Sequence, residues 1–263
     1  MLCRDVIKKI EDVYPKTAAL EWDNVGLLVG RSEKEVRGIY VALDATDEVI
    51  DAAIACGADL LVTHHPLIFS PLKRITDEAF VGERVLKLLQ ADITYYAIHT
   101  NYDVLGMADL SAALLDLQDT EALEVTGLSA EDGKTEIGIG RVGMLVEEQT
   151  LGNCCALVKQ AFALPNVKVF GSLGQKVQRI AVSPGSGKHM AEFALAKGAD
   201  VLVTGDIDHH EGIDAVAQGL AIIDAGHYGL EHIFIADMSV WLAENIEGVQ
   251  VMKEDIRHPF MVL

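Results

Sequence analysis

An internal repeat constrains the fold of this chain more than any other feature of its sequence. The segment "AIACGADLLVTHH" (53–65) aligns without a gap with "ALAKGADVLVTGD" (194–206), 141 residues further along. Each copy joins the end of an apolar helix, through a glycine, to a short run of buried-strand residues. A repeat of this kind predicts two similar α/β lobes, in which strand ends from both halves meet.

The residues around each copy predict the same alternation of strands and helices. The run 37–45 is β-branched and apolar, and 46–57 has helical spacing, with Thr46 as its N-cap and Gly57 at its end. With the strand 58–65 these segments predict a βαβ unit. Further helices are expected near 79–91, 107–119 and 188–198, and strand segments within 92–103, 177–187, 199–210 and 220–229.

The length and the central region set the expected domain division. A chain of 263 residues can bury two modest cores. Residues 135–172 predict a strand pair, a helix and a further strand, and the preceding 120–135 end in a polar, glycine-containing stretch. We therefore expect a first α/β lobe at 1–125 and a second at 126–263.

Charge and hydropathy exclude several classes of partner. With 40 acidic and 21 basic residues the formal charge is -19, which opposes direct binding to nucleic acid. No apolar run approaches the ~20 residues that cross a bilayer, so we expect a cytoplasmic protein without a membrane segment. Four cysteines without a CxxC pair predict buried free thiols: Cys3, Cys56, Cys154 and Cys155.

Polar residues follow two neighbouring strands of the first lobe. His64 and His65 end "LLVTHH", and Asp103 ends "YYAIHTNYD". Ligands of parallel sheets gather beyond the carboxyl ends of the strands, and imidazole and carboxylate suit Zn, Fe, Mn and Co. A single histidine at such a position is more often a structural group. His99 is equally compatible with a group in the pocket and with a surface residue. The adjacent pair together with Asp103 favours a metal site.

A second cluster lies in "DAGHYGLEHIF" (224–234), which ends a strand of the second lobe. If a helix begins near Tyr228, His227 and Glu231 are four residues apart and project toward one side. The alternative is a capping histidine and a solvated glutamate. The repeat places this segment opposite the first cluster, which favours the site.

The two clusters combine into five candidate ligands: His64, His65, Asp103, His227 and Glu231. Three imidazoles and two carboxylates are too many for one tetrahedral catalytic site with an open position. They suit two metals bridged by a carboxylate, so the sequence predicts a dinuclear centre between the lobes.

Three other motifs carry weaker signals. His209 and His210 in "TGDIDHHEGIDA" are interpreted as proton donors or as partners of the ligands, with surface residues as the alternative. "GIGRVG" (138–143) is followed by a strand-like run and predicts a hairpin, not a dinucleotide site. "GSGKH" (185–189) lacks the P-loop pattern, because His189 replaces its Ser or Thr.

Taken together, these motifs closely resemble the Nif-three-like family, whose members are named GTP cyclohydrolase 1 type 2 homologues. The resemblance implies two α/β domains, a dinuclear metal centre, a ring-shaped homohexamer, and metal ligands at the same five positions. One departure is Asp206, where many members carry Glu. The matching stretches are "EWDNVGLLVG" (21–30), "VTHHPLIF" (62–69), "IHTNYD" (98–103), "GIGRVG" (138–143), "TGDIDHH" (204–210) and "DAGHYGLE" (224–231).

The expected function is that of a dinuclear metal-binding protein. Two divalent transition-metal ions per chain would activate water for a hydrolase acting on a nucleotide-like or other small substrate. The alternative is a non-catalytic metal-handling protein or an interaction scaffold, and a further one is a structural metal that joins the halves. The same ligands serve each role.

Overall fold

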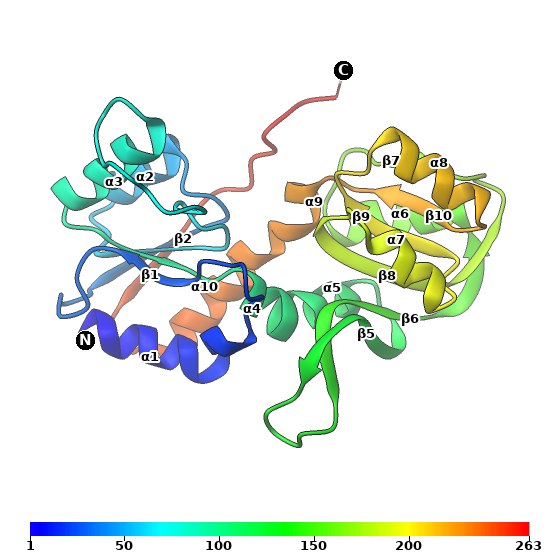
Figure 1. Cartoon of the computed structure of the whole chain (residues 1–263), viewed down its shortest axis with the longest axis horizontal. Helices are drawn as coiled ribbons and strands as arrows, with labels where there is room; N and C mark the ends of the chain where they lie inside the picture. Colours follow the sequence, from blue (N-terminus) through cyan, green and yellow to red (C-terminus); the bar gives the residue numbers. More distant parts are fainter. Residues whose placement is uncertain (263) are drawn as a thin grey trace. The chain divides into compact units, whose positions relative to one another are not determined.

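The computed structural model describes residues 1–262, which form two units (Figure 1). The first unit contains Met1–Tyr102 and His232–Ile256. The second contains Asp103–Glu231 and the C-terminal residues from Arg257 onward. Among the described residues, no helix is long and apolar enough to cross a membrane.

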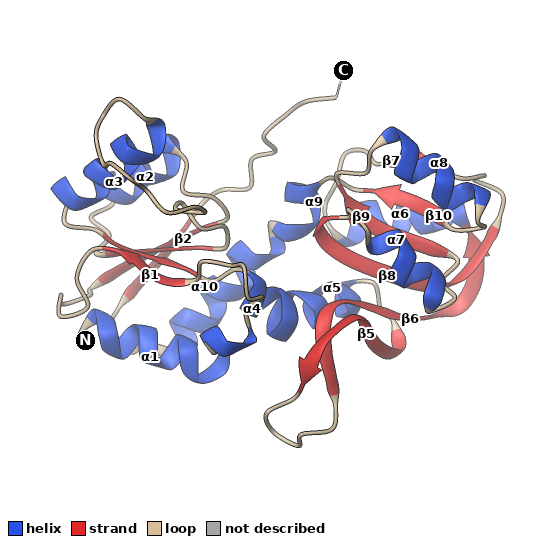
Figure 2. Cartoon of the chain, viewed as in Figure 1, coloured by secondary structure: helices blue, strands red, loops and turns tan. Residues whose placement is uncertain are grey.

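The first unit is built on a five-stranded sheet with the order β1-β4-β3-β2-β11. β1 is antiparallel to β4, and the other neighbours are parallel. Helices α2 and α3 lie on one face of the sheet, and α1 and α10 on the other (Figure 2). The strands are β1 (Gly26–Val29), β2 (Gly38–Ala42), β3 (Leu60–Thr63), β4 (Thr94–Ala97) and β11 (Gln250–Lys253). The helices are α1 (Cys3–Val13), η1 (Lys16–Ala18), α2 (Asp47–Ala55), α3 (Phe80–Gln90), α4 (Thr100–Tyr102) and α10 (Ile233–Asn245).

The second unit is built on a six-stranded sheet with the order β5-β6-β8-β9-β10-β7. The neighbouring pairs β8–β9 and β9–β10 are parallel, and the other neighbours described in this sheet are antiparallel. The strands are β5 (Gln118–Leu128), β6 (Glu136–Thr150), β7 (Lys168–Phe170), β8 (Lys176–Ser186), β9 (Val201–Gly205) and β10 (Ala221–Asp224). The helical segments are η2 (Asp103–Met107, a π-helical turn), α5 (Ala108–Leu114), α6 (Leu151–Ala161), α7 (Met190–Ala196), α8 (His209–Ala217) and α9 (His227–Glu231).

The repeated segments take the same local structure for the same reasons. Gly57 and Gly198 follow helices α2 and α7 with φ of 71° and 69°, a left-handed conformation that suits glycine. Two residues later, each copy has an aspartate whose carboxylate accepts two backbone N–H groups at the start of the neighbouring strand. Asp59 does so for β2 and Asp200 for β8. The repeated strands, β3 and β9, each lie between two parallel neighbours.

The structure confirms the α/β class and most of the expected elements. Thr46 caps α2 by accepting a hydrogen bond from the Val49 N–H at 3.2 Å, as expected. α9 begins at His227, one residue before the expected start. "GIGRVG" lies within β6, which pairs with β5 as an antiparallel hairpin.

The domain division differs from a single break at residue 125. Residues 120–135, the expected joint, form most of β5 and the turn into β6. β11 pairs with β2 in the first unit, although its residues lie at the C-terminal end of the chain. Strand pairing is a tertiary property. A single cut in the sequence therefore cannot assign β11 to the first unit, where it pairs with β2.

We predict that Gly57→Ala and Gly198→Ala each lower the free energy of unfolding by about 1 kcal/mol. A Cβ at either position meets no atom within 4 Å, so only the left-handed backbone opposes it. Urea unfolding followed by circular dichroism measures the loss. Gly174→Ala is the control, because that position has open space without a left-handed φ, and it should leave stability unchanged. Equal stability of all three variants would contradict the prediction.

Candidate metal centre

The turn that carries His64 and His65 directly follows β3 and is held by Tyr95. The Tyr95 hydroxyl lies 2.8 Å from the His65 carbonyl oxygen and 2.7 Å from Thr63 Oγ1. It also accepts the Leu67 N–H at 2.8 Å. Burial raises the pKa of Tyr95, so its hydroxyl stays protonated. The backbone at the two histidines is therefore fixed before any ligand binds.

Three histidine rings gather in the first unit. One ligand atom from each of His64, His65 and His99 lies within 4.8 Å of the others. His64 is fully buried, and His65 and His99 are partly exposed. His99 was equally compatible with two roles on sequence grounds, and the structure places it in this cluster.

Each of these rings is held at Nδ1 by an oxygen. The partners are the Ile98 carbonyl oxygen at 3.0 Å for His64, Asp44 Oδ1 at 2.8 Å for His65, and Asp23 Oδ1 at 2.9 Å for His99. These oxygens accept, so the Nδ1 atoms donate, and a neutral ring then offers its Nε2 lone pair. This is the arrangement found around histidines that ligate metals. The donor set suits a transition metal.

Asp23 is the most constrained of these supporting carboxylates. Its side chain is fully buried, and it accepts hydrogen bonds from His99 Nδ1, the Thr100 N–H and the Thr100 hydroxyl. Burial by itself would raise the pKa of Asp23, but the hydrogen bonds from His99 and Thr100 outweigh it and lower the pKa to about 2. Asp23 therefore remains a carboxylate that can orient His99.

The second unit contains its own cluster around α9. His227 Nε2 lies 3.1 Å from Glu231 Oε2, and His227 Nδ1 lies 2.8 Å from Asp206 Oδ2. Glu231 is almost completely buried. As expected from their spacing, His227 and Glu231 lie together on one turn. Asp206 plays the part for His227 that Asp44 plays for His65.

The buried carboxylate of Asp224 ties together the loops that carry this cluster. Its oxygens accept the Ile207 N–H at 3.2 Å and the Gly226 N–H at 3.1 Å. Lys168 Nζ lies 2.7 Å from Asp224 Oδ2 and compensates its charge. The loop after β9 and the loop after β10 are thus joined at one point, which positions Asp206 and His227.

Two glycines leave room for the cluster. A Cβ at Gly185 would lie 2.4 Å from Glu231 Oε1, and a Cβ at Gly205 would lie 2.4 Å from the His227 backbone nitrogen. A side chain at Gly205 would clash with backbone, and one at Gly185 would displace the Glu231 carboxylate. Gly185, in the "GSG" stretch that resembles part of a P-loop, therefore lets the backbone lie close to the Glu231 carboxylate. In the repeat, Gly205 and Asp206 stand where the first copy has His64 and His65.

The remaining sequence candidates are Asp103, His209 and His210. Asp103 is the first residue of the second unit, directly after Tyr102, and is partly buried at the start of η2. His209 and His210 are exposed in the first turn of α8, with ring centroids 5.2 Å apart. Their role as proton donors, and the joining of all five ligands in one centre, stay predictions.

Sequence reasoning missed the carboxylates that hold the rings. Asp44 follows β2, the strand beside β3, so its place at a strand end was an available signal. Asp206 was noted without a role. Asp23 lies in a loop 76 residues before His99, and nothing local to it predicts their contact.

We predict that Asp23 contributes to stability in a pH-dependent way. Its folded pKa of about 2 is below the ordinary value of 3.8, so its contribution is present above about pH 4 and is lost as pH falls toward 2. In chelator-treated protein at pH 7, Asp23→Asn should lower the free energy of unfolding by about 2 kcal/mol. Urea unfolding at several pH values tests this, and a wild-type-to-variant difference that stays constant from pH 7 to 3 would contradict it.

Comparison with known proteins agrees with the motifs. The chain is 33% identical to the GTP cyclohydrolase 1 type 2 homolog of Clostridium perfringens, over 99% of both chains. It is 36% identical to the protein of that name from Lactococcus lactis, also over 99% of both. The crystal structure of a Bacillus cereus protein related to NIF3 superposes with a TM-score of 0.93 at 28% identity, covering 100% of this chain and 99% of the other.

These matches confirm the resemblance inferred from the six sequence stretches. The profile of the family Duf34/NIF3 (NGG1p interacting factor 3) matches residues 1–259, nearly the whole chain. The chain therefore belongs to the Duf34/NIF3 family.

Proposed function

We propose that the chain is a metal-dependent hydrolase that acts on a nucleotide-like or other small substrate. The observation that carries the proposal is that oxygen acceptors hold the histidine rings at Nδ1. Four rings, those of His64, His65, His99 and His227, each have Nδ1 within hydrogen-bond distance of an oxygen. Core histidines need one such partner, but a whole set of rings held in the same way at Nδ1 fits metal ligation better. The relatives named GTP cyclohydrolase 1 type 2 homolog agree with this choice of function.

The proposed centre holds two divalent transition-metal ions per chain, Zn, Fe, Mn or Co. Its ligands are His64, His65, Asp103, His227 and Glu231. Asp103 and Glu231 are the residues at which the chain enters and leaves the main part of the second unit. Divalent ions of this kind supply Lewis-acid activation of water for hydrolysis.

The chain's own residues have distinct roles in the proposed reaction. Asp44, Asp23 and Asp206 orient imidazoles and hold a proton at Nδ1. His209 and His210, exposed at the start of α8, are the proposed proton donors to a leaving group.

A second candidate is a non-catalytic metal-handling role. His99 favours it, because a third imidazole within 4.8 Å of His64 and His65 offers an additional donor to an ion in transit. A metal donor loses its ions to a chelator or to an apo partner quickly, whereas an enzyme keeps them through turnover. A purely structural metal is distinguished by His64→Ala, which would then abolish folding together with binding.

Assembly and partners follow from the family resemblance and the charge. We propose a cytoplasmic homo-oligomer, a homohexamer by resemblance, with a small-molecule substrate. The formal charge of -19 argues against direct binding to nucleic acid.

We predict that protein purified without added metal carries about two divalent ions per chain and that Asp103→Ala lowers this content. Mass-spectrometric metal analysis measures it. Asp51→Ala, which removes an exposed carboxylate on α2, is the control and should retain the metals. An Asp103→Ala protein that keeps both ions would overturn the ligand assignment.

An activity screen of the same proteins separates the two candidate functions. The metal-loaded wild type should hydrolyse a member of a nucleotide and phosphoester panel, and Asp103→Ala should not. Metal-loaded protein without turnover across the panel would leave the hydrolase proposal without support and favour metal handling.

We also predict that Asp206→Asn weakens metal binding by about 10–100-fold, because the His227 ring loses its charged acceptor. Competition with a chromophoric chelator measures the affinity. Asp208→Asn is a matched control: Asp208 caps α8 by accepting from the Glu211 N–H at 2.9 Å, and asparagine caps a helix equally well. Equal affinities of the two variants would remove the orienting role of Asp206.

A further inference from the structure

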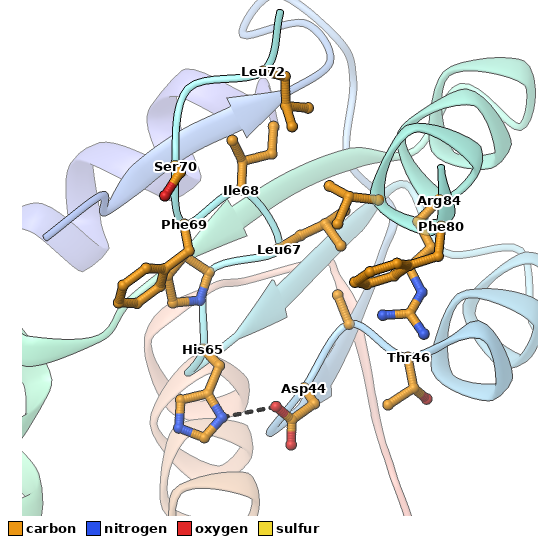
Figure 3. A pocket seen from close by; sticks show the side chains of 13 residues that line it. Asp44, Thr46, His65, Leu67, Ile68, Phe69, Ser70, Leu72, Phe80 and Arg84 are labelled. Atoms are coloured by element: carbon orange, nitrogen blue, oxygen red, sulfur yellow. Dashed lines mark hydrogen bonds and ion pairs between the residues drawn. The ribbon is translucent and has the colours of Figure 1, made fainter. Parts of the chain in front are cut away.

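A pocket of about 440 Å³ adjoins the histidine cluster of the first unit (Figure 3). His65 and Asp44 lie at one end, Arg84 and Phe80 at the other, and the segment after His65, including Leu67 and Phe69, forms a further wall. Its volume lies within the range of small-molecule sites, and its lining is mainly apolar. Because His65 is a proposed metal ligand, a molecule in this pocket lies beside the proposed reaction centre.

Phe69 is an exposed aromatic ring held in position by its neighbours. Its exposed fraction is 58%, yet its ring centroid lies 5.7 Å from that of Trp22 and 6.3 Å from that of His99. The backbone beside it is also held, since Asn24 Nδ2 donates to the Ile68 carbonyl oxygen at 2.6 Å. An apolar ring that is both exposed and ordered is available for stacking.

Phe80 is a second such ring, at the start of α3, with an exposed fraction of 68%. The Arg84 guanidinium lies 5.2 Å from its ring centroid, one helical turn further along. Asp47 in turn holds Arg84, because Arg84 Nη2 donates a hydrogen bond to Asp47 Oδ2 at 3.0 Å. The cation–π contact and the ion pair together orient the Phe80 ring.

The charges around the pocket identify the kind of ligand. Arg84 is the one cationic side chain among the described lining residues, and Asp47 already neutralises it. Asp44 adds a carboxylate at the end beside His65. A polyanionic group is therefore disfavoured here, whereas an uncharged ring with N–H donors meets apolar walls and a carboxylate acceptor.

We propose that this pocket binds the planar heteroaromatic ring of the substrate, with Phe69 and Phe80 as stacking walls and Asp44 as an acceptor for N–H groups in the ring or attached to it. The identity of the ligand as a substrate rests on the proposed hydrolase function. The pocket itself depends only on contacts within the first unit.

Saturation-transfer NMR with adenosine, cytidine and nicotinamide as probes tests the pocket without catalysis. The ring protons of at least one probe should be saturated, while ribose and cyclohexanol should not be. Phe80→Ala should weaken binding about tenfold or more, as loss of a stacking partner does. Phe80→Leu, which keeps an apolar side chain, should weaken it similarly. Leu89→Ala is the control, because Leu89 is 49% exposed on the same helix and does not line the pocket.

Three results of these experiments would overturn the proposal. Equal saturation of cyclohexanol would indicate a general apolar patch, and unchanged binding by folded Phe80→Leu would exclude the stacking wall. Dissociation of an oligomer in Phe80→Ala, measured by sedimentation, would assign the pocket to a second copy of the chain. Binding should persist in metal-free protein, so failure of ring binding is distinguishable from failure of the metal centre.

Discussion

The hydrogen bond between histidine Nδ1 and an oxygen acceptor is the interaction on which the candidate site depends. An imidazole can turn about two bonds and can carry its proton on either nitrogen, so an unsupported ring specifies neither direction nor tautomer. In this chain a backbone carbonyl or a carboxylate removes both freedoms at each of the four rings. The fold supplies those acceptors from strand ends and adjoining loops, which links the sheet architecture to the chemistry.

The two copies of the internal repeat share the residues that shape their local structure and differ at the end of the strand. Both copies keep the glycine after the helix and the aspartate that binds the neighbouring strand, because these residues stabilise the helix-to-strand connection itself. The copies differ at the strand end. His65 is a candidate ligand, whereas Asp206 at the equivalent position supports His227. Gly205, in place of His64, gives the His227 backbone room to approach. The shared residues thus stabilise the helix-to-strand connection, and the differing residues lie in the candidate cluster of each unit.

Both the pocket and the histidine cluster of the first unit involve the turn and the segment that follow β3. Tyr95 fixes its beginning through the His65 carbonyl and the Leu67 N–H, and Asn24 fixes it at Ile68. The polar contacts at its base thus position the ring of His65, a candidate ligand, and the exposed Phe69 farther along lines the pocket. One short segment therefore carries both the candidate ligand His65 and the pocket residue Phe69.

The sequence by itself determined the α/β class, the repeated helix-to-strand segments, the cap of α2 and the turn that brings His227 beside Glu231. Each of these depends on neighbours within a few residues, where hydrophobic period, capping and helical spacing act directly. Only the tertiary structure decided that β11 returns to β2, that Asp23 holds His99 across 76 residues, and that Phe69 and Phe80 face one pocket. These contacts arise from strand order and packing between distant segments, which local pattern does not encode.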